Sequence, residues 1–407
     1  MPDRVLFQYA GLFLVALSGI AVVSLIGDPV YVVAFSTFAA VVAASILIAW
    51  AAEASEFAIS QGLALAVVAI VQTIPEYFVE GTIAWKAGQD PSNWLPNVIA
   101  NFTGANRLLT GVGWPLILFT LAVQKRRKHQ SGPLAIGLAN EQSVEVIFML
   151  GGSLYYLLIL VKGNLTILDT VALTAIFVVY MFILGKLPPE RENPDQVLSG
   201  APLVLVKIKK KRRRIGAISG LFIFCGLVFV IITDPFVNSL HNIAVILLGP
   251  SSVFFFIQWI APLLSEFPEK VTAFNWARKI TLAPMALLNF LSSAVNELTA
   301  LVAVIPVVFS LSIGSFGTVP LGIHGTEIFL TMAQSLYACA SLLDLEYNTS
   351  NAAVLFGFWF VSTVFVETRL AIAVAFVVMT LAEVVVQRKR IRVFSAFRET
   401  LRSSISR

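Results

Sequence analysis

Apolar runs of membrane length constrain this 407-residue chain more than any other feature of its sequence. Hydrophobic residues make up 58% of the chain and charged residues 13%, which is more apolar surface than a water-soluble fold can bury. Continuous runs predict helices, because a transmembrane barrel would show short alternating segments. We therefore expect an all-α polytopic membrane protein that has the lipid bilayer as a partner.

Twelve runs are long enough to be read as spans when the weaker stretch 236–248 is taken as an interfacial or half helix. They are residues 5–26, 31–52, 62–85, 95–123, 134–160, 165–184, 215–232, 251–276, 282–311, 321–343, 352–366 and 370–386. The first run is longer than the apolar part of a signal peptide, which favours a retained helix.

The basic residues are distributed unevenly between the two ends of these helices. Alternating spans put most of them on one side, namely Arg4, residues 125–128, residues 207–214, residues 278–279 and the tail from 387. The other side receives only three isolated cations, Lys86, Lys162 and Arg369. The positive-inside rule then predicts cytoplasmic termini in a plasma or inner membrane. Because the +5 net charge lies in juxtamembrane clusters, it does not indicate nucleic-acid binding.

Two apolar runs contain a proline followed by a glutamate, in Gln72-Thr73-Ile74-Pro75-Glu76 and in Ser265-Glu266-Phe267-Pro268-Glu269. A carboxylate inside a membrane span costs roughly 2.5–3.5 kcal/mol, which predicts a functional role. A proline removes one helical hydrogen bond, and we expect it to release the carbonyls of Val71 and Leu264. The four-residue spacing predicts that Gln72 shares a helix face with Glu76, and Ser265 with Glu269.

The predicted topology directs these two helices oppositely across the membrane. Oppositely directed copies of one motif are typical of inverted-repeat transporters, whose site lies near the bilayer midplane. One helix downstream of each motif lies a stretch of small and amide residues, Asn101 to Asn106 and Asn289 to Glu297. Such residues also mediate close helix packing, but their paired position favours a role as ligands.

This arrangement resembles the sodium/calcium exchanger family of the cation/calcium antiporter superfamily over about residues 31–366. That family has two inverted repeats, each with a Gly-Thr-Ser-x-Pro-Glu/Asp signature and a downstream Gly-Asn-x-x-Gly-Ser-Asn signature. This chain departs from the pattern at Val71-Gln72 and in the additional carboxylates Glu266 and Glu297. The second downstream signature leaves open whether Asn289 or Asn296 is the counterpart.

The resemblance implies repeats of about five helices each, with one extra helix at each end. The expected divisions are an N-terminal helix in 1–30, a first repeat in 31–185, a basic linker in 186–214, a second repeat in 215–366, and a last helix with a basic tail in 367–407.

The resemblance also implies one cation site built from both repeats. Its expected ligands are Glu76, Glu269, Thr73, Gln72, Ser265, Glu266, Asn101, Asn106, Asn289, Ser293 and Asn296. Calcium accepts 6–8 oxygen ligands of these kinds in flexible geometry. Two facing carboxylates repel when no cation is bound, so at least one should take up a proton or a monovalent ion.

We therefore expect a secondary antiporter that exchanges Ca²⁺ for Na⁺ or H⁺ by alternating access, with no cofactor besides the transported cations. The alternatives are a non-transporting scaffold or passive channel, and an intramembrane enzyme that uses paired acids. The sequence contains no phosphate-binding glycine loop, nucleophile elbow or zinc motif, so we expect neither ATP-driven transport nor an enzyme. Oligomeric state, ion identity and stoichiometry stay open.

Four other acidic residues lie near predicted helix ends. We expect Glu141 and Glu145 to be solvated charges at a helix start, and we assign no role to Glu327 and Glu383.

Overall fold

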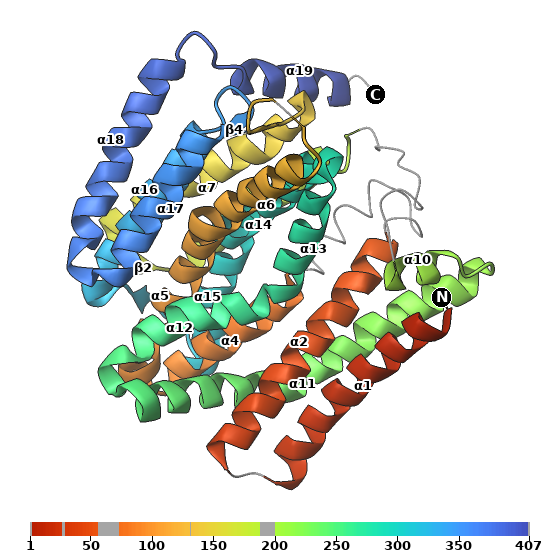
Figure 1. The fold of residues 1–407 in the computed structure, drawn as a ribbon. Coiled ribbons are helices and arrows are strands. Elements are labelled where there is room, and N and C mark those ends of the chain that lie inside the picture. Colours follow the sequence, from red (N-terminus) through yellow and green to blue (C-terminus); the bar gives the residue numbers. More distant parts are fainter. Residues whose placement is uncertain (1, 27–28, 56–72, 131, 188–199, 406–407) are drawn as a thin grey trace. The chain divides into compact units, whose positions relative to one another are not determined.

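The computed structural model describes residues 2–26, 29–55, 73–130, 132–187 and 200–405, which are almost entirely helical (Figure 1). This confirms the predicted all-α polytopic fold. The chain separates into two compact units, each built from both halves of the sequence. Unit 1 contains residues 1–83 and 184–269, and unit 2 contains residues 84–183 and 270–407.

Unit 1 is organised around a pair of long helices that pack side by side. Its helices are α1 (Pro2–Leu25), α2 (Val30–Ser55), α10 (Ala201–Val206), α11 (Lys211–Leu248), α12 (Val253–Ser265), and the first residues of α4 (Ile74–Gln89) and α13 (Phe267–Arg278). Helix α2 packs against both α1 and α11 (Figure 1). The contact with α1 is close, because a Cβ added to Gly19 would lie 2.5 Å from the Cβ of Ala40. Small residues allow helix backbones to approach in this way.

Helix α11 differs from its prediction. The sequence predicted a span at 215–232 and a separate stretch at 236–248, but the structure has one helix through Pro235. A proline in a helix interior removes a hydrogen bond and usually kinks or breaks the helix. Here the apolar residues on both sides, Ile232, Phe236 and Val237, are buried and hold the helix in one piece.

Unit 2 contains most of the remaining helices and all the described strands. Its helices are α5 (Pro91–Leu108), α6 (Trp114–Arg127), α7 (Ser143–Lys162), α8 (Ile167–Leu184, up to residue 183), α14 (Ala283–Asn296), α15 (Val302–Ile313), α16 (Gly325–Ala340), α17 (Thr349–Val364), α18 (Arg369–Gln387) and α19 (Val393–Ile405). Its short elements are the π-helical turns η1 (Leu109–Gly113) and η5 (Glu297–Leu301), the 3-10 turns η2 (Asn140–Gln142), η4 (Ile280–Leu282), η6 (Gly322–His324) and η7 (Val366–Thr368), and the strands β1 (Ala135–Gly137), β2 (Asn164–Leu165), β3 (Val319–Pro320) and β4 (Glu346–Asn348). A further 3-10 turn, η3 (Pro250–Ser252), belongs to unit 1.

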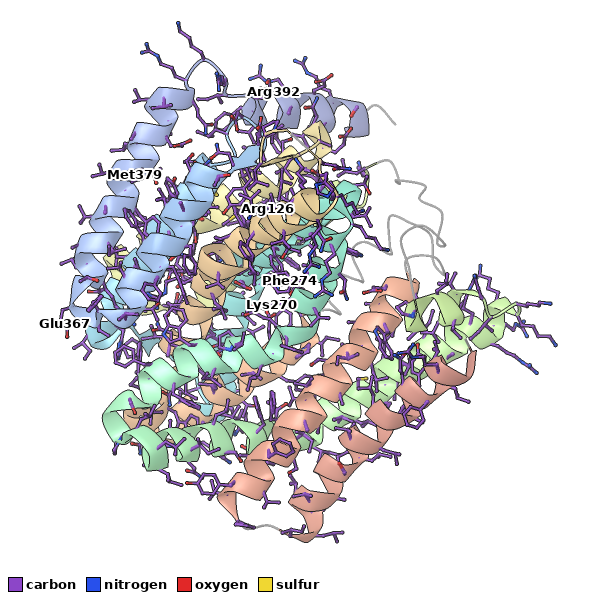
Figure 2. The ribbon with its side chains drawn as sticks, in the orientation of Figure 1. Arg126, Lys270, Phe274, Glu367, Met379 and Arg392 are labelled. Atoms are coloured by element: carbon purple, nitrogen blue, oxygen red, sulfur yellow. The ribbon has the colours of Figure 1, made fainter. Side chains whose placement is uncertain are left out.

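The later part of α13 belongs to unit 2. Figure 2 shows Lys270 and Phe274 about one turn apart on this helix. The Phe274 ring packs edge-to-face against Phe290 of α14, with centroids 6.3 Å apart. This contact fixes α13 against the helix that carries the second asparagine stretch.

Strand pairing shows an inverted repeat within unit 2. The order helix, π turn, helix, strand, helix, strand occurs once as α5 to β2 and again as α14 to β4. β1 pairs antiparallel with β4, and β2 pairs antiparallel with β3. Because β1 precedes α7 and β4 follows α16, these two contacting helices run in opposite directions. Unit 2 thus contains copies of one motif in opposite orientation, as the sequence predicted.

Eight helical segments among the described residues are long and apolar enough to cross a membrane. Two further apolar helices, α12 and α17, are shorter. The predicted span at 62–85 begins in residues outside the described part of the chain. The protein is therefore a multi-pass integral membrane protein.

Candidate functional site

Both proline–glutamate motifs lie where a helix begins. Pro75 is the second residue of α4 and Pro268 is the second residue of α13, so each following glutamate lies in a first helical turn. The sequence predicted one span over 251–276, but the structure divides it into α12 and α13, and Pro268 lies in the first turn of α13, where a proline loses no intrahelical bond. The positive end of the helix dipole instead stabilises the carboxylates of Glu76 and Glu269.

The break before α13 also separates two predicted ligands. α12 ends at Ser265, and Glu266 connects it to α13 with φ −91° and ψ 2°. Ser265 and Glu269 therefore do not share one helix face, contrary to the prediction. The Ser265 hydroxyl donates to the carbonyl of Ala261 at 3.1 Å. Gln72 and Val71, predicted for the equivalent place before α4, lie outside the described residues.

Because each proline is the second residue of its helix, the two motifs can be aligned residue by residue on their prolines. Two residues before each proline stand Thr73 in the first motif and Glu266 in the second. Both side chains are buried. The second motif therefore has a carboxylate where the first has a hydroxyl. The two motifs together carry one more negative charge than they would if both had a hydroxyl at this position.

Unit 1 brings two of the carboxylates close together. An oxygen of Glu76 and an oxygen of Glu266 lie within 4.8 Å of each other, and the two residues are 3% and 2% exposed. At an effective dielectric constant of about 20, two negative charges no farther apart than this repel by at least roughly 3.5 kcal/mol. Bound protons or a divalent cation remove this repulsion. Glu269, also in unit 1, is similarly buried.

The predicted amide ligands lie in unit 2, on α5 and α14. Asn101, Asn106, Ser293 and Asn296 are buried, and Asn289 is half-buried. Each helix leads into a π-helical turn, a feature that is frequent at functional sites.

These π turns give a register for the two asparagine stretches. Asn101 precedes the start of η1 at Leu109 by eight residues, and Asn289 precedes the start of η5 at Glu297 by eight residues. Asn289 is therefore the positional counterpart of Asn101, whereas Asn296 directly precedes its turn. Whether these amides bind a cation stays a prediction.

Helix α16 supplies polar contacts that the sequence did not predict. It packs against α5 in unit 2 with a buried polar face. Its hydrogen bonds to α5 and to η1, which follows α5, are Thr331 Oγ1 to Thr103 O (3.4 Å), Gln334 Nε2 to Arg107 O (2.9 Å) and Thr110 Oγ1 (2.8 Å), and Ser335 Oγ to Asn106 Oδ1 (2.6 Å). This face therefore contacts the later part of the first asparagine stretch and the residues that follow it.

A buried ionic cluster lies beside these contacts. Glu327 Oε2 is 2.9 Å from Nη2 of Arg107, and its Oε1 is hydrogen-bonded by Nη1 of Arg369. Arg369 Nε also donates to the carbonyl of Ser362 at 3.1 Å. Glu327 received no role from its position near a helix end. The sequence feature that could have indicated a buried ion pair is Arg107, because an arginine inside an apolar run requires an acidic or carbonyl partner.

Glu145 also differs from its prediction. Glu141 is exposed, as expected for a solvated charge, but Glu145 on α7 is 4% exposed. The prediction for Glu145 was wrong because one helical turn carries its side chain away from the surface and into the packing of α7. The sequence contains no local signal for that rotation.

Comparison with known proteins places this architecture among ion exchangers. A family model described as "Sodium/calcium exchanger protein" matches residues 29–186. The crystal structure of the H⁺/Ca²⁺ exchanger CAX is 31% identical, covers 99% of this chain and 99% of its own, and superposes with a TM-score of 0.90. A search of curated proteins found no match.

Two more distant structures share the fold. The Ca²⁺/H⁺ antiporter protein YfkE is 14% identical, with a TM-score of 0.53, and the match covers 90% of this chain and 99% of that one. The sodium-calcium exchanger NCX_Mj, soaked with Na⁺ and Ca²⁺, is 14% identical with a TM-score of 0.52, covering 88% and 98%. At these identities the likeness concerns the fold alone.

Proposed function

Because this chain belongs to the sodium/calcium exchanger family of the cation/calcium antiporter superfamily, we propose that it is a secondary antiporter that exchanges Ca²⁺ for H⁺. The observation that carries the proposal is the pair of buried carboxylates, Glu76 and Glu266, within 4.8 Å in unit 1. The likeness to an H⁺/Ca²⁺ exchanger over the full chain supports H⁺ as the counter-ion.

The chemistry of the carboxylates supports exchange. Ca²⁺ prefers oxygen ligands and is compensated by two negative charges, which Glu76 and Glu266 or Glu269 supply. When Ca²⁺ leaves, the remaining carboxylates repel until protons neutralise them. Each occupant therefore lowers the cost of the charged site in the membrane, and occupancy by one excludes the other. This competition is the physical basis of antiport.

The other predicted ligands complete the oxygen set in this proposal. They are Thr73, Gln72, Ser265, Asn101, Asn106, Asn289, Ser293 and Asn296. We further propose that both termini face the cytoplasm, in accordance with the basic clusters.

The test is ⁴⁵Ca²⁺ uptake into proteoliposomes that contain the full chain. We expect an imposed outward H⁺ gradient to drive uptake, and an equal Na⁺ gradient to drive none. Glu76→Gln and Glu269→Gln should abolish uptake while the protein still inserts, because each removes a buried charge that Ca²⁺ needs. The matched control is Glu141→Gln, which changes an exposed glutamate and should transport like the wild type.

Three outcomes would contradict the proposal. Wild-type flux in both glutamine variants would exclude the carboxylates from the pathway. Uptake driven by Na⁺ alone would reassign the counter-ion. Uptake that proceeds equally with no imposed counter-gradient would indicate a passive channel.

A further inference from the structure

A basic segment that has no role in the exchange site follows the last membrane span of unit 2. Residues 388–402 contain six arginines and lysines and one glutamate, and they lead from α18 into α19. Arg388, Lys389 and Arg390 are exposed, and none of the three forms an ion pair with another described residue. Their charge is therefore directed toward whatever surrounds this end of unit 2.

The segment begins at the boundary of the membrane. Helix α18 has 19 residues, which rise about 28 Å at roughly 1.5 Å per residue, close to the roughly 30 Å of a hydrocarbon core. Arg388, the residue after α18, therefore lies at the level of the lipid headgroups. The positive-inside rule assigns this end to the cytoplasmic side, where the leaflet contains anionic lipids.

Helix α19 is held at the same level by contacts with the ends of other helices. The backbone N–H groups of Arg392 and Val393 donate to the carbonyl of Leu343, just after α16, at 2.8 and 3.1 Å. Thr400 Oγ1 donates at 3.4 Å to the carbonyl of Asn140, where the span that contains α7 begins. Figure 1 shows α19 lying across this end of unit 2.

The two faces of α19 have different surroundings. The inner face packs against α7 and η2 and consists of residues at most 5% exposed, namely Val393, Ala396 and Thr400. The outer face carries an exposed stripe at four-residue spacing, formed by Phe394, Arg398 and Arg402. Phe394 is 51% exposed. An aromatic ring in line with arginines suits a membrane interface, where the ring enters the acyl boundary and the guanidinium groups remain among the headgroups.

We propose that residues 388–390 and the outer face of α19 bind the headgroups of anionic phospholipids. Arginine matches phosphate because its planar guanidinium group forms two parallel hydrogen bonds with phosphate oxygens. The bilayer is favoured over other anionic partners because it already surrounds α18. The exposed ring of Phe394 adds an apolar contact that a free phosphate ion cannot use. This proposal does not depend on which cations the protein exchanges.

The first test is equilibrium binding of a fluorescent phosphatidylglycerol to the purified full chain in an uncharged detergent, with unlabelled lipids as competitors. We expect phosphatidylglycerol to compete at a concentration at least about fivefold below that of phosphatidylcholine, the effect of roughly one basic residue at a membrane surface. The combined variant Arg388→Gln, Lys389→Gln and Arg390→Gln should lose this preference, because it removes the charges that adjoin the headgroups.

The matched control neutralises three exposed charges at the end of α6, by Arg126→Gln, Arg127→Gln and Lys128→Gln. Figure 2 shows Arg126 well apart from Arg392, which precedes α19. The control lowers the net charge of unit 2 by the same amount and should keep the preference for phosphatidylglycerol. An equal loss in the control would show that only total charge matters, and it would overturn the proposal.

A second test measures whether α19 meets the lipid surface. Both cysteines, Cys225 and Cys339, are buried, so a fluorophore can be attached selectively to Ser395→Cys on the exposed side of α19. We compare vesicles of phosphatidylcholine with vesicles of phosphatidylcholine and phosphatidylglycerol in equal amounts. A spin label on the headgroups should quench the fluorophore at least about twofold more in the anionic vesicles. The variant neutralised at 388–390 should lose this difference.

Two further results would overturn the proposal. Equal quenching in the two kinds of vesicle would show that α19 does not bind anionic lipid. Displacement of the fluorescent lipid by inorganic phosphate, at the concentration at which phosphatidylglycerol displaces it, would indicate a site for free phosphate. Both measurements report lipid binding directly, so they remain valid whatever ions the protein transports.

Discussion

Replacing Glu327 by glutamine tests the buried ionic cluster of unit 2 most directly. The side chains of Arg107, Glu327 and Arg369 are only 0%, 8% and 3% exposed, so solvent screens their charges little. Two arginines and one glutamate carry a net charge of +1. Glu327→Gln raises that net charge to +2 and leaves both guanidinium groups without their carboxylate.

Removing one partner of a buried ion pair costs about 3–5 kcal/mol, because the remaining charge stays buried. For a unit of this size, 1 kcal/mol shifts the Tm by roughly 2–4 °C. We therefore expect Glu327→Gln to lower the Tm of the purified protein by on the order of 10 °C, as measured by thermal unfolding in detergent. Arg369→Gln should cost less than half as much, since it leaves Arg107 and Glu327 as a neutral pair.

The control for this prediction is an ion pair of the same unit that is partly exposed. Lys162 Nζ lies 2.5 Å from Asp169 Oδ2, and the lysine side chain is 29% exposed. The Asp169 side chain is 1% exposed, but in the variant it keeps hydrogen bonds from Tyr155 and Thr166, so Lys162→Met should cost less than Glu327→Gln. The order of the three variants is the decisive result. The electrostatic reasoning is wrong if the Tm of Glu327→Gln lies within about 2 °C of the wild-type Tm. It is also wrong if Arg369→Gln lowers the Tm more than Glu327→Gln does.

Three further predictions concern packing, a helix cap and ligand binding. Gly111→Ala should destabilise the protein by about 1–3 kcal/mol, because the new Cβ would lie 2.6 Å from a tryptophan side chain of α17. In the control Gly151→Ala the new Cβ meets no atom within 4 Å, so this variant should be neutral or stabilising in the same melting assay. A hydrogen bond from Ser92, with others beside it, lowers the pKa of Asp90 below its ordinary value of 3.8. Because the pKa of Asp90 is lowered by folding, its stabilisation is fully present above the pKa of the unfolded state and is lost only as the pH falls through the pKa of the folded state. The Tm difference between the wild type and Asp90→Ala should therefore stay constant from about pH 8 to about pH 5. A Tm difference that shrinks between about pH 7 and pH 5 would contradict this. Ca²⁺ at 100 times its Kd should stabilise the wild type by about 2.7 kcal/mol but not Glu76→Gln, and equal Ca²⁺-dependent shifts in both would exclude Glu76 as a ligand.

Sequence patterns predicted the features that have a local cause. Apolar runs of membrane length identify helices from composition alone. The two proline–glutamate motifs were found because a carboxylate is costly inside such a run. The inverted order within unit 2 followed from counting spans and basic clusters, and the pairing of β1 with β4 and of β2 with β3 agrees with it.

The features that the sequence left open depend on contacts between distant residues. Arg107 and Glu327 are 220 positions apart, and only the fold places them 2.9 Å from each other. Ser335 has no sequence feature that links it to Asn106. Glu145 was assigned to solvent from its position in a first turn, but burial depends on which side of α7 its neighbours cover.

The position of the helix breaks could not be read from the prolines alone, since proline occurs both at kinks and in first turns. Pro235 lies inside a continuous helix, while Pro268 lies in the first turn of a new one. What distinguishes them is a buried carboxylate, because Glu269 after Pro268 is buried, whereas Asp234 before Pro235 is exposed. A glutamate in the middle of a continuous span would lack donors, whereas a helix start offers unpaired N–H groups and a positive dipole.

The same break supplies groups of the opposite kind. The last carbonyls of α12, ending at Ser265, lie directly before the start of α13 with Glu269 in its first turn. A helix that ends inside a membrane leaves carbonyl oxygens, which suit a cation, and a helix that begins there leaves N–H groups, which suit a carboxylate. Under the proposed function, one interruption would thus stabilise the acid while it is charged and add oxygen ligands for the transported cation. For this reason, the proline–glutamate pair within an apolar run is a stronger indication of a cation site than a buried glutamate by itself.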